Sequence, residues 1–346
     1  MSVDTLAGAS EDQRASLTSR VLPMMTLSKG SSPLTRPLPP VPFTSALSRA
    51  EARFQVQGKA IVTGGAGALG LISAQALLEH GLSSLCIMDL PRTLETSEEQ
   101  IQSLASKFPS ANITKIPLDV TSMESIQAAF EQAENTMEGI DILCCFAGIP
   151  GCQPSLTVTP DQFNRVIDVN LNGSFFCAQA AAKRMESSGK GGCILFTASM
   201  SAHYTNFPQP QAAYNASKAG VAHMTRNLAA EWAVHGIRVN SISPGYMDTI
   251  LNAGKSLANV RKIWDSRCPM GRMGDPEEIT GAVVLLCSQR AGRYITGADI
   301  VIDGGDFDSV TRYCIECFPS YYQVDVPVSV FFYFSKGSVF FNISSP

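Results

Sequence analysis

The chain repeats one unit between Gly58 and Gly305: a short apolar segment, a turn and a helical pattern. The first unit has an apolar strand at Lys59 to Thr63 and a helix from Leu69 to His80, which Gly81 ends. Strands this apolar are expected where helices cover both faces of a sheet. Seven such strands alternating with helices predict an α/β fold, with one doubly wound parallel sheet in a single domain.

The further elements follow the same alternation. Strands are expected at 85–89, 113–118, 140–146, 193–198, 237–242 and 299–302. Helices are expected at 95–107, 123–137, 160–185, 212–234 and 276–287.

A glycine-rich turn joins the first strand to the first helix. Glycines there let the backbone approach a pyrophosphate at the helix N-terminus, which is typical of a Rossmann-type sheet. The residues expected to line that phosphate site are Gly64, Ala68, Leu69 and Gly70.

Asp89 ends the second strand about 20 residues after the last of these glycines, where a carboxylate can bond the adenosine ribose. A strand-end turn aspartate is the alternative. Because a carboxylate repels a 2′-phosphate, NAD is favoured as cofactor. Arg92 nearby leaves NADP open.

Tyr214 and Lys218 stand four residues apart in the helical segment that begins at Ala212, so both lie on one helix face. A phenol titrates near 10, but an adjacent ammonium favours the phenolate. Tyr214 would then exchange a proton with an alcohol or ketone oxygen. Ser199 follows an apolar strand, at the sheet edge where such folds bind ligands. The spacing alone also fits a chance surface pair.

The whole set of motifs, in this order, resembles the short-chain dehydrogenase/reductase family. The resemblance covers about residues 54 to 305. It rests on the glycine-rich turn, Asp89, Asn170, Ser199, Tyr214 and Lys218, and on Asp119, Val120, Ala147, Gly148, Pro244, Gly245 and Thr249 at the ends of further strands.

The resemblance implies a role for each position. Tyr214 would be the general acid/base, and Lys218 would lower the pKa of Tyr214 and hold the nicotinamide ribose. Ser199 would orient the substrate oxygen, and Asn170 would hold a water in a proton relay with Lys218. Pro244 to Thr249 would line the nicotinamide. Two simpler interpretations stay open, with Asn170 satisfying a helix kink and Thr249 acting as a cap.

Two departures from the family pattern stand out. Ala68 replaces the middle glycine of the turn, which should narrow the phosphate site without closing it. Cys145 and Phe146 replace an Asn-Asn pair, whereas Ala147 and Gly148 still permit close approach of the cofactor. These changes leave a second hypothesis, an inactive dinucleotide-binding scaffold.

Within the family, the segment from Asn206 to Lys218 is similar to fungal polyol and ketose enzymes, namely D-arabinitol 2-dehydrogenase, sorbose reductase and mannitol 2-dehydrogenase. Amides both donate and accept, so Gln209 and Gln211, together with Ser201, suit a substrate with several hydroxyls. The amides would equally brace the loop. The expected reaction interconverts a secondary alcohol and a ketone, with a polyol and its ketose first and a ketone of secondary metabolism as the alternative.

Composition limits the partners. A net charge of -4 gives no basic footprint, so a small-molecule substrate is expected rather than nucleic acid. No apolar run reaches about 18 residues, so no membrane span is expected. The cysteines that lie in apolar runs indicate a reducing compartment. We expect a cytoplasmic protein, with a mitochondrial address left open.

The flanks differ from this central domain. Residues 1–53 hold Ser, Thr and Pro clusters and are expected to form a disordered arm. Residues 306–346 form an atypical tail, either a genuine extension or a gene-model error. A homotetramer or homodimer is expected because small residues allow close helix packing between subunits, and the two long helices carry Ala178, Ala180, Ala181, Ala182, Ala219, Ala222, Ala229 and Ala230.

Overall fold

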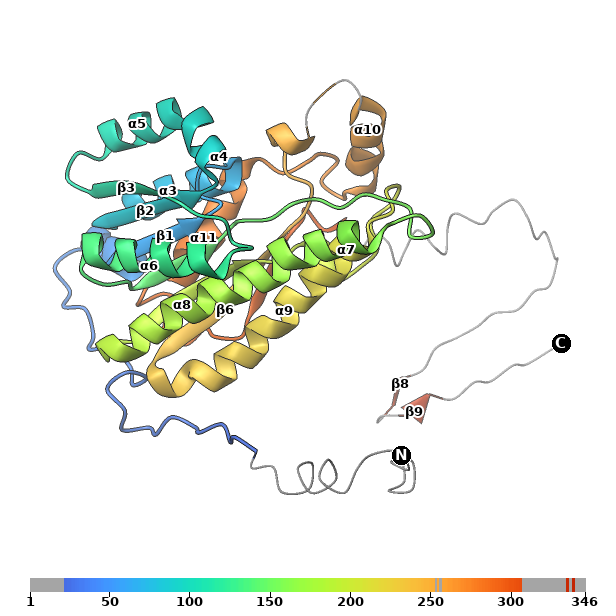
Figure 1. Ribbon diagram of the computed structural model, residues 1–346. Coiled ribbons are helices and arrows are strands. Elements are labelled where there is room, and N and C mark those ends of the chain that lie inside the picture. Colours follow the sequence, from blue (N-terminus) through green and yellow to red (C-terminus); the bar gives the residue numbers. More distant parts are fainter. Residues whose placement is uncertain (1–21, 253, 255–256, 307–333, 336–337, 340–346) are drawn as a thin grey trace, which may run out of the picture.

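The computed structural model describes residues 22–252, 254, 257–306, 334–335 and 338–339. Its centre is a parallel sheet of seven strands in the order β3-β2-β1-β4-β5-β6-β7 (Figure 1). This confirms the predicted doubly wound sheet. The strands are β1 (Lys59–Thr63), β2 (Ser84–Asp89), β3 (Asn112–Pro117), β4 (Ile142–Cys145), β5 (Gly192–Thr197), β6 (Ile237–Pro244) and β7 (Asp299–Ile302). A separate antiparallel pair joins β8 (Phe334–Ser335) to β9 (Ser338–Val339).

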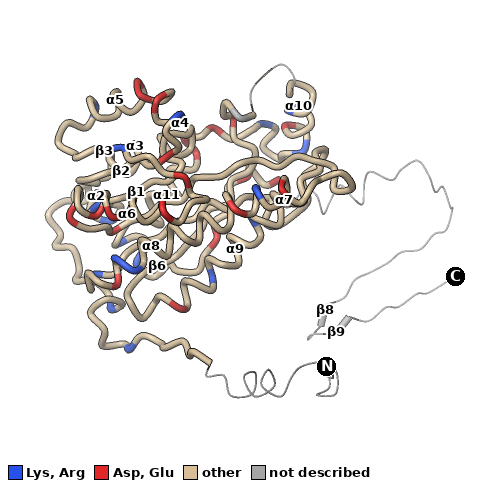
Figure 2. Tube along the Cα trace, in the orientation of Figure 1, with Lys and Arg blue, Asp and Glu red and all other residues tan. Residues whose placement is uncertain are grey.

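Helices cover both faces of the sheet, which explains the continuous apolar strands. One face packs against α6 (Met123–Met137), α8 (Gly173–Ser188) and α9 (Ala212–Trp232), with Phe130 and Phe196 fully buried in that core (Figure 1). The other face packs against α3 (Ala68–Glu79), α5 (Glu98–Lys107) and α11 (Thr280–Cys287). Figure 2 shows basic and acidic residues interspersed over the helices.

Strand order reverses between β1 and β4, which both pair with neighbours in parallel register. In open α/β sheets, ligands bind outside the carboxyl ends of the strands at such a reversal. The turn after β1 and the loop after β4 meet there, since Gly64 lies against the backbone of Phe146 and Ala147. The fold therefore positions a ligand site at this edge.

Several helices differ from the expected ones. The segment predicted as one helix at 95–107 is α4 (Pro91–Thr96) followed by α5, because Ser97 interrupts it with a non-helical backbone. The segment expected at 160–185 is α7 (Pro160–Ile167), a π-helical turn at Asp168–Asn172, and α8. Helix α10 (Ala258–Arg267) was not predicted, because its apolar period is weak. No described helix combines the length and apolarity that crossing a membrane requires.

The described part of the N-terminal arm contains one helix and several contacts with the domain. Helix α2 (Ala46–Phe54) is capped by the Ser45 side chain. Arg293 Nη2 donates to the carbonyls of Leu34 and Arg36, and Arg290 Nη1 donates to the carbonyl of Pro39. Charged side chains thus fix the arm to the domain. Residues 1–21, and the tail from residue 307 except for β8 and β9, lie outside the described part.

The alanine faces proposed for subunit contacts are largely internal. The alanines buried against the sheet are Ala178, Ala181, Ala182, Ala222 and Ala229. Their small side chains let α8 and α9 approach the strands of their own subunit, which the sequence pattern alone does not distinguish from an interface. Ala219 and Ala230 are exposed and Ala180 is half-buried, so only these three remain available to a partner.

Candidate active site

Tyr214 and Lys218 lie together near the start of α9. The helix begins at Ala212, two residues after Pro210, and the Lys218 Nζ lies 5.6 Å from the centroid of the Tyr214 ring. The ammonium donates to the carbonyl of Thr197, the last residue of β5, at 2.8 Å. This hydrogen bond fixes α9 to the sheet edge beside Ser199.

Burial dominates the protonation of both groups. It lowers the pKa of Lys218 from 10.5 to about 8. It raises the pKa of Tyr214, while the Ser199 hydroxyl lowers that pKa by hydrogen bonding and the Cys152 thiol raises it. Lys218 is not among the causes of this pKa shift, so the lowering of the Tyr214 pKa by Lys218 that the family resemblance implies stays a prediction. Ser199 favours the phenolate when its single hydroxyl hydrogen turns from the Ser201 hydroxyl toward Tyr214.

Ser199 is the N-cap of a short 3₁₀ turn at Met200–Ala202, just after β5. Its hydroxyl accepts from the backbone N–H of Ser201 at 3.1 Å and donates to the Ser201 hydroxyl at 3.1 Å. Both serines are buried. The turn therefore holds the two hydroxyls at the carboxyl edge of the sheet, as the sequence predicted for Ser199.

Asn170 is fully buried in the π-helical turn between α7 and α8. Its amide accepts from the backbone N–H of Ile149 at 2.8 Å and donates to the carbonyl of Ile149 at 3.0 Å and to the Ser217 hydroxyl at 3.1 Å. The side chain thus braces the loop after β4 against α9. A methyl group on Gly148 would lie 3.3 Å from Asn170 Oδ1 and 3.6 Å from Lys218 Nζ. Gly148 therefore keeps the space between them open.

The glycine-rich turn fits a phosphate group. Gly64 has φ +65°, and a side chain there would collide with Phe146 and Ala147, while one on Gly70 would collide with Gly64 and Gly65. Helix α3 begins after Gly67 without a side-chain cap, so the first-turn N–H groups of Ala68, Leu69 and Gly70 lack intrahelical acceptors. Such a terminus binds anions. The Ala68 side chain is exposed, consistent with the expectation that it does not close the site.

Asp89 lies beside this turn at the end of β2. Its carboxylate accepts from the backbone N–H of Ala66 at 3.2 Å and of Leu90 at 2.8 Å. These bonds hold the carboxylate next to the glycine-rich turn, where the ribose of a dinucleotide would lie. The strand-end turn interpretation explains only the bond to Leu90.

The other predicted cofactor positions line the same edge. The Asp119 carboxylate is exposed and accepts from Thr121 N at 2.9 Å, and Val120 packs over Gly173. Gly245 follows β6 and donates to the carbonyl of Ile302 at 2.8 Å. The remaining positions are Ala147 after β4, buried Pro244 at the end of β6, and Thr249, whose carbonyl accepts from Asn252 N at the next 3₁₀ turn.

A chain of side-chain amides extends from Ser201. Gln211 Nε2 donates to the Ser201 hydroxyl at 3.2 Å and to Asn206 Oδ1 at 2.7 Å. Asn206 Nδ2 and Gln209 Nε2 both donate to the Tyr246 hydroxyl. Gln209 and Gln211 are therefore bonded to protein groups, as the bracing interpretation requires. The network that they brace adjoins Ser199.

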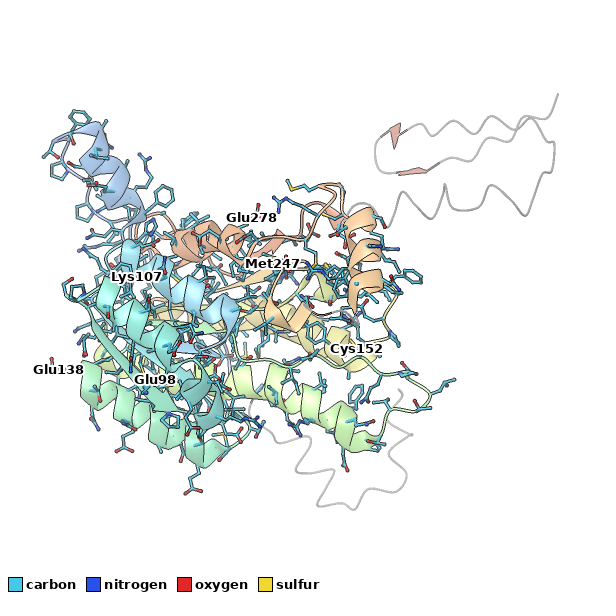
Figure 3. The ribbon with its side chains drawn as sticks, turned by 90° about the horizontal axis from the view of Figure 1, so that it is seen from above. Glu98, Lys107, Glu138, Cys152, Met247 and Glu278 are labelled. Carbon is cyan, nitrogen blue, oxygen red and sulfur yellow. The ribbon has the colours of Figure 1, made fainter. Side chains whose placement is uncertain are left out.

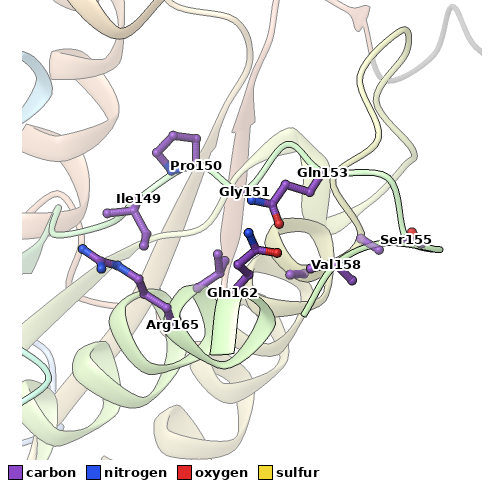
Figure 4. A pocket seen from close by; sticks show the side chains of 11 residues that line it. Ile149, Pro150, Gly151, Gln153, Ser155, Val158, Gln162 and Arg165 are labelled. Carbon is purple, nitrogen blue, oxygen red and sulfur yellow. The ribbon is translucent and has the colours of Figure 1, made fainter. Parts of the chain in front are cut away.

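A pocket of about 180 Å³ opens between the loop after β4, α7 and the start of α9 (Figure 4). Its α9 lining residues, Ala212 and Ala213, directly precede Tyr214 in the chain. Figure 3 shows Cys152 of this loop and Met247 of the loop after β6 on the α10 side of the molecule, away from Lys107 and Glu138. The lining residues include Gln153, Gln162 and Arg165, whose side chains appear in Figure 4.

Three residues of this region were not singled out from sequence. The Cys152 thiol donates to Gln211 Oε1 at 3.5 Å, and the Trp264 ring stacks on Tyr246 with centroids 4.1 Å apart. Tyr246 directly follows Pro244 and Gly245, which are predicted cofactor positions, so its place in the sequence could have indicated that it lies at the site. Trp264 comes from the unpredicted helix α10, and no pattern in the sequence links it to the site.

Comparison with known proteins gives consistent matches. Residues 64–306 match the family model described as Enoyl-(Acyl carrier protein) reductase. The D-arabinitol 2-dehydrogenase (ribulose-forming) of Scheffersomyces stipitis is 35% identical over 263 residues, covering 73% of this chain and 95% of that enzyme. The NADP-dependent mannitol dehydrogenase of Hypocrea jecorina is 35% identical over 255 residues, covering 73% and 93%.

A solved structure agrees with them. The crystal structure of a short-chain type dehydrogenase/reductase from Mycobacterium marinum is 39% identical, with a TM-score of 0.68, and covers 73% of this chain and 97% of that one. The chain therefore belongs to the short-chain dehydrogenase/reductase family, and it is an NAD(P)-dependent oxidoreductase that interconverts a secondary alcohol and a ketone.

Proposed function

We propose that the substrate is a polyol and that the product is its ketose. The observation that carries this proposal is the amide network of Asn206, Gln209 and Gln211, which adjoins the Ser199 hydroxyl through Ser201. The network ends in the Ser201 and Tyr246 hydroxyls, and a hydroxyl both donates and accepts, so these two groups suit a substrate rich in hydroxyl groups. Relatives named for arabinitol and mannitol support the same substrate class.

In this proposal each side chain has one task. Tyr214 transfers the proton to or from the reacting oxygen, and Ser199, which favours the phenolate, orients that oxygen. Lys218 holds the nicotinamide ribose, and Asn170 fixes the loop that borders it. The phosphates lie on Gly64, Ala68, Leu69 and Gly70. When bound, the nicotinamide cofactor supplies or takes up the hydride.

We also propose that NAD is preferred over NADP. The Asp89 carboxylate, held beside the glycine-rich turn by Ala66 N, would repel a 2′-phosphate. The Hypocrea jecorina relative is named as NADP-dependent, so the cofactor of this chain needs its own measurement. The ratio of kcat/KM with NADH to that with NADPH decides it, and a ratio below one contradicts the proposal.

The test of the substrate class is an oxidation assay on the purified protein. D-arabinitol, mannitol and sorbitol are each supplied with NAD and, separately, with NADP, and the growth of reduced cofactor is followed by absorbance. Turnover of at least one polyol is expected. Activity on an aromatic or polyketide ketone without polyol turnover would move the protein to secondary metabolism. Cofactor binding with no turnover on any carbonyl would favour the inactive scaffold.

Two further properties are proposed from the sequence. The protein assembles as a homodimer or homotetramer, with Ala180, Ala219 and Ala230 on the outward sides of α8 and α9. A light-scattering mass near 37.0 kDa, that of one chain, would contradict this assembly. The cytoplasmic location is tested by cell fractionation, in which recovery with mitochondria would support the alternative address.

A further inference from the structure

The Tyr246 hydroxyl accepts two hydrogen bonds from side-chain amides. Asn206 Nδ2 donates to it at 3.1 Å and Gln209 Nε2 donates at 2.9 Å. A phenol oxygen both donates one hydrogen and accepts, so these two donors occupy its accepting side. Among the described residues, no side chain or carbonyl accepts the hydrogen of this hydroxyl. The Tyr246 hydroxyl can therefore donate one further hydrogen bond.

The neighbouring groups fix this arrangement. Trp264 Nε1 donates to Gln209 Oε1 at 3.1 Å, so the amide nitrogen of Gln209 must face Tyr246. Gln211 Nε2 donates to Asn206 Oδ1 at 2.7 Å, so the amide nitrogen of Asn206 must face Tyr246 as well. The Tyr246 ring is stacked on Trp264 with an interplanar angle of 10°. The direction of every bond thus makes Tyr246 an acceptor from the protein.

The hydroxyl also belongs to the active-site edge. Tyr246 follows β6 directly after the Pro-Gly pair, and Gln211 links its network to Ser201 and thus to Ser199. The Cys152 thiol of the loop after β4 donates to Gln211 Oε1 at 3.5 Å, so the same network also contacts the loop that lines the pocket. Burial raises the pKa of Tyr246 to about 12, so its hydroxyl remains protonated at neutral pH.

We propose that Tyr246 recognises the substrate by donating a hydrogen bond to a hydroxyl oxygen other than the one that reacts at Tyr214. This inference rests on the proposed polyol and ketose function and names the residue that reads a second hydroxyl. A hollow of about 10 Å³ beside Tyr246, also lined by Asp303 and Asp306, has room for about one water, which is the competing acceptor.

The test compares two ketones with the same five-carbon skeleton and carbonyl position. D-ribulose carries hydroxyls on its other carbons, and 2-pentanone carries none. For Tyr246→Phe we expect kcat/KM on ribulose to fall about tenfold, mainly through KM, because one hydrogen bond is lost. The value for 2-pentanone should stay within about twofold. Where 2-pentanone turns over slowly, its inhibition constant against ribulose gives the same comparison.

Equal losses on both ketones would overturn the proposal, because they would mean that the hydroxyl only braces the loop or binds water. No loss on ribulose would overturn it too. Trp264→Phe removes the donor that orients Gln209 and keeps a ring on Tyr246, so Gln209 Oε1 becomes free to accept from the Tyr246 hydroxyl, and ribulose should again lose more than 2-pentanone. Tyr294→Phe, at a fully exposed phenol, should change neither. A wild-type protein that reduces no ketose refutes the proposed function itself, whereas ribulose turnover unaffected by Tyr246→Phe refutes only this inference.

Discussion

Lys218 is placed where its charge destabilises the folded protein without cofactor. The side chain is 5% exposed, and burial lowers its pKa from 10.5 to about 8. At about 1.4 kcal/mol per pKa unit, this shift opposes folding by about 3 kcal/mol at neutral pH. Replacing Lys218 by Met keeps the apolar stem and removes the ionisable group. It also loses the hydrogen bond to the carbonyl of Thr197, which offsets about 1 kcal/mol.

We therefore expect Lys218→Met to raise the free energy of unfolding by about 2 kcal/mol at neutral pH, or Tm by roughly 5 °C, while turnover is lost. The sign follows from proton binding. Between pH 8 and 10.5 the unfolded chain holds a proton that the folded chain has released, so wild-type stability rises with pH in this window. The higher free energy of unfolding of Lys218→Met relative to wild type is therefore fully present below about pH 8 and disappears above pH 10.5.

Urea unfolding at several pH values, without cofactor, measures this difference. Lys190→Met, at an exposed lysine, is the matched control and should show no such pH dependence. A less stable Lys218→Met protein at neutral pH, or a difference that stays constant up to pH 10.5, would refute the reasoning.

Four further predictions concern the proposed chemistry and the chain ends. Tyr214→Phe should keep cofactor affinity and lose turnover by roughly a hundredfold or more, the scale of a general acid/base; normal turnover would move the proton route elsewhere. Asp89→Asn should raise the NADPH to NADH ratio of kcat/KM about tenfold through loss of a like-charge repulsion, and an unchanged ratio would exclude Asp89 from the ribose site. A chain that ends at Asp306 should keep activity and gain solubility, because the removed tail is apolar. One that ends at Gly305 should melt lower, since it lacks the buried carboxylate that accepts from the Tyr204 hydroxyl at 3.1 Å.

Features that depend on near neighbours in the chain were predictable. The seven strands and the turn at Gly64 follow from periods of two and 3.6 residues and from glycines between a strand and a helix. Tyr214 and Lys218 meet because four residues bring them to one helix face. The carboxyl edge of a parallel sheet then collects these segments, so the place of the site followed from the order of the motifs.

Features that depend on distant contacts were decided only by the tertiary structure. Alanine spacing on α8 and α9 is the same for packing against the sheet and for packing against a partner, and only burial separated Ala178 from Ala230. The pKa of Lys218 depends on burial by segments remote in sequence. The Tyr246 hydroxyl keeps its hydrogen for another acceptor because Trp264 fixes the Gln209 amide with its nitrogen toward the Tyr246 oxygen. The sequence does not say which way the oxygen and nitrogen of a side-chain amide point, because only the hydrogen-bond partners in the folded protein determine this orientation.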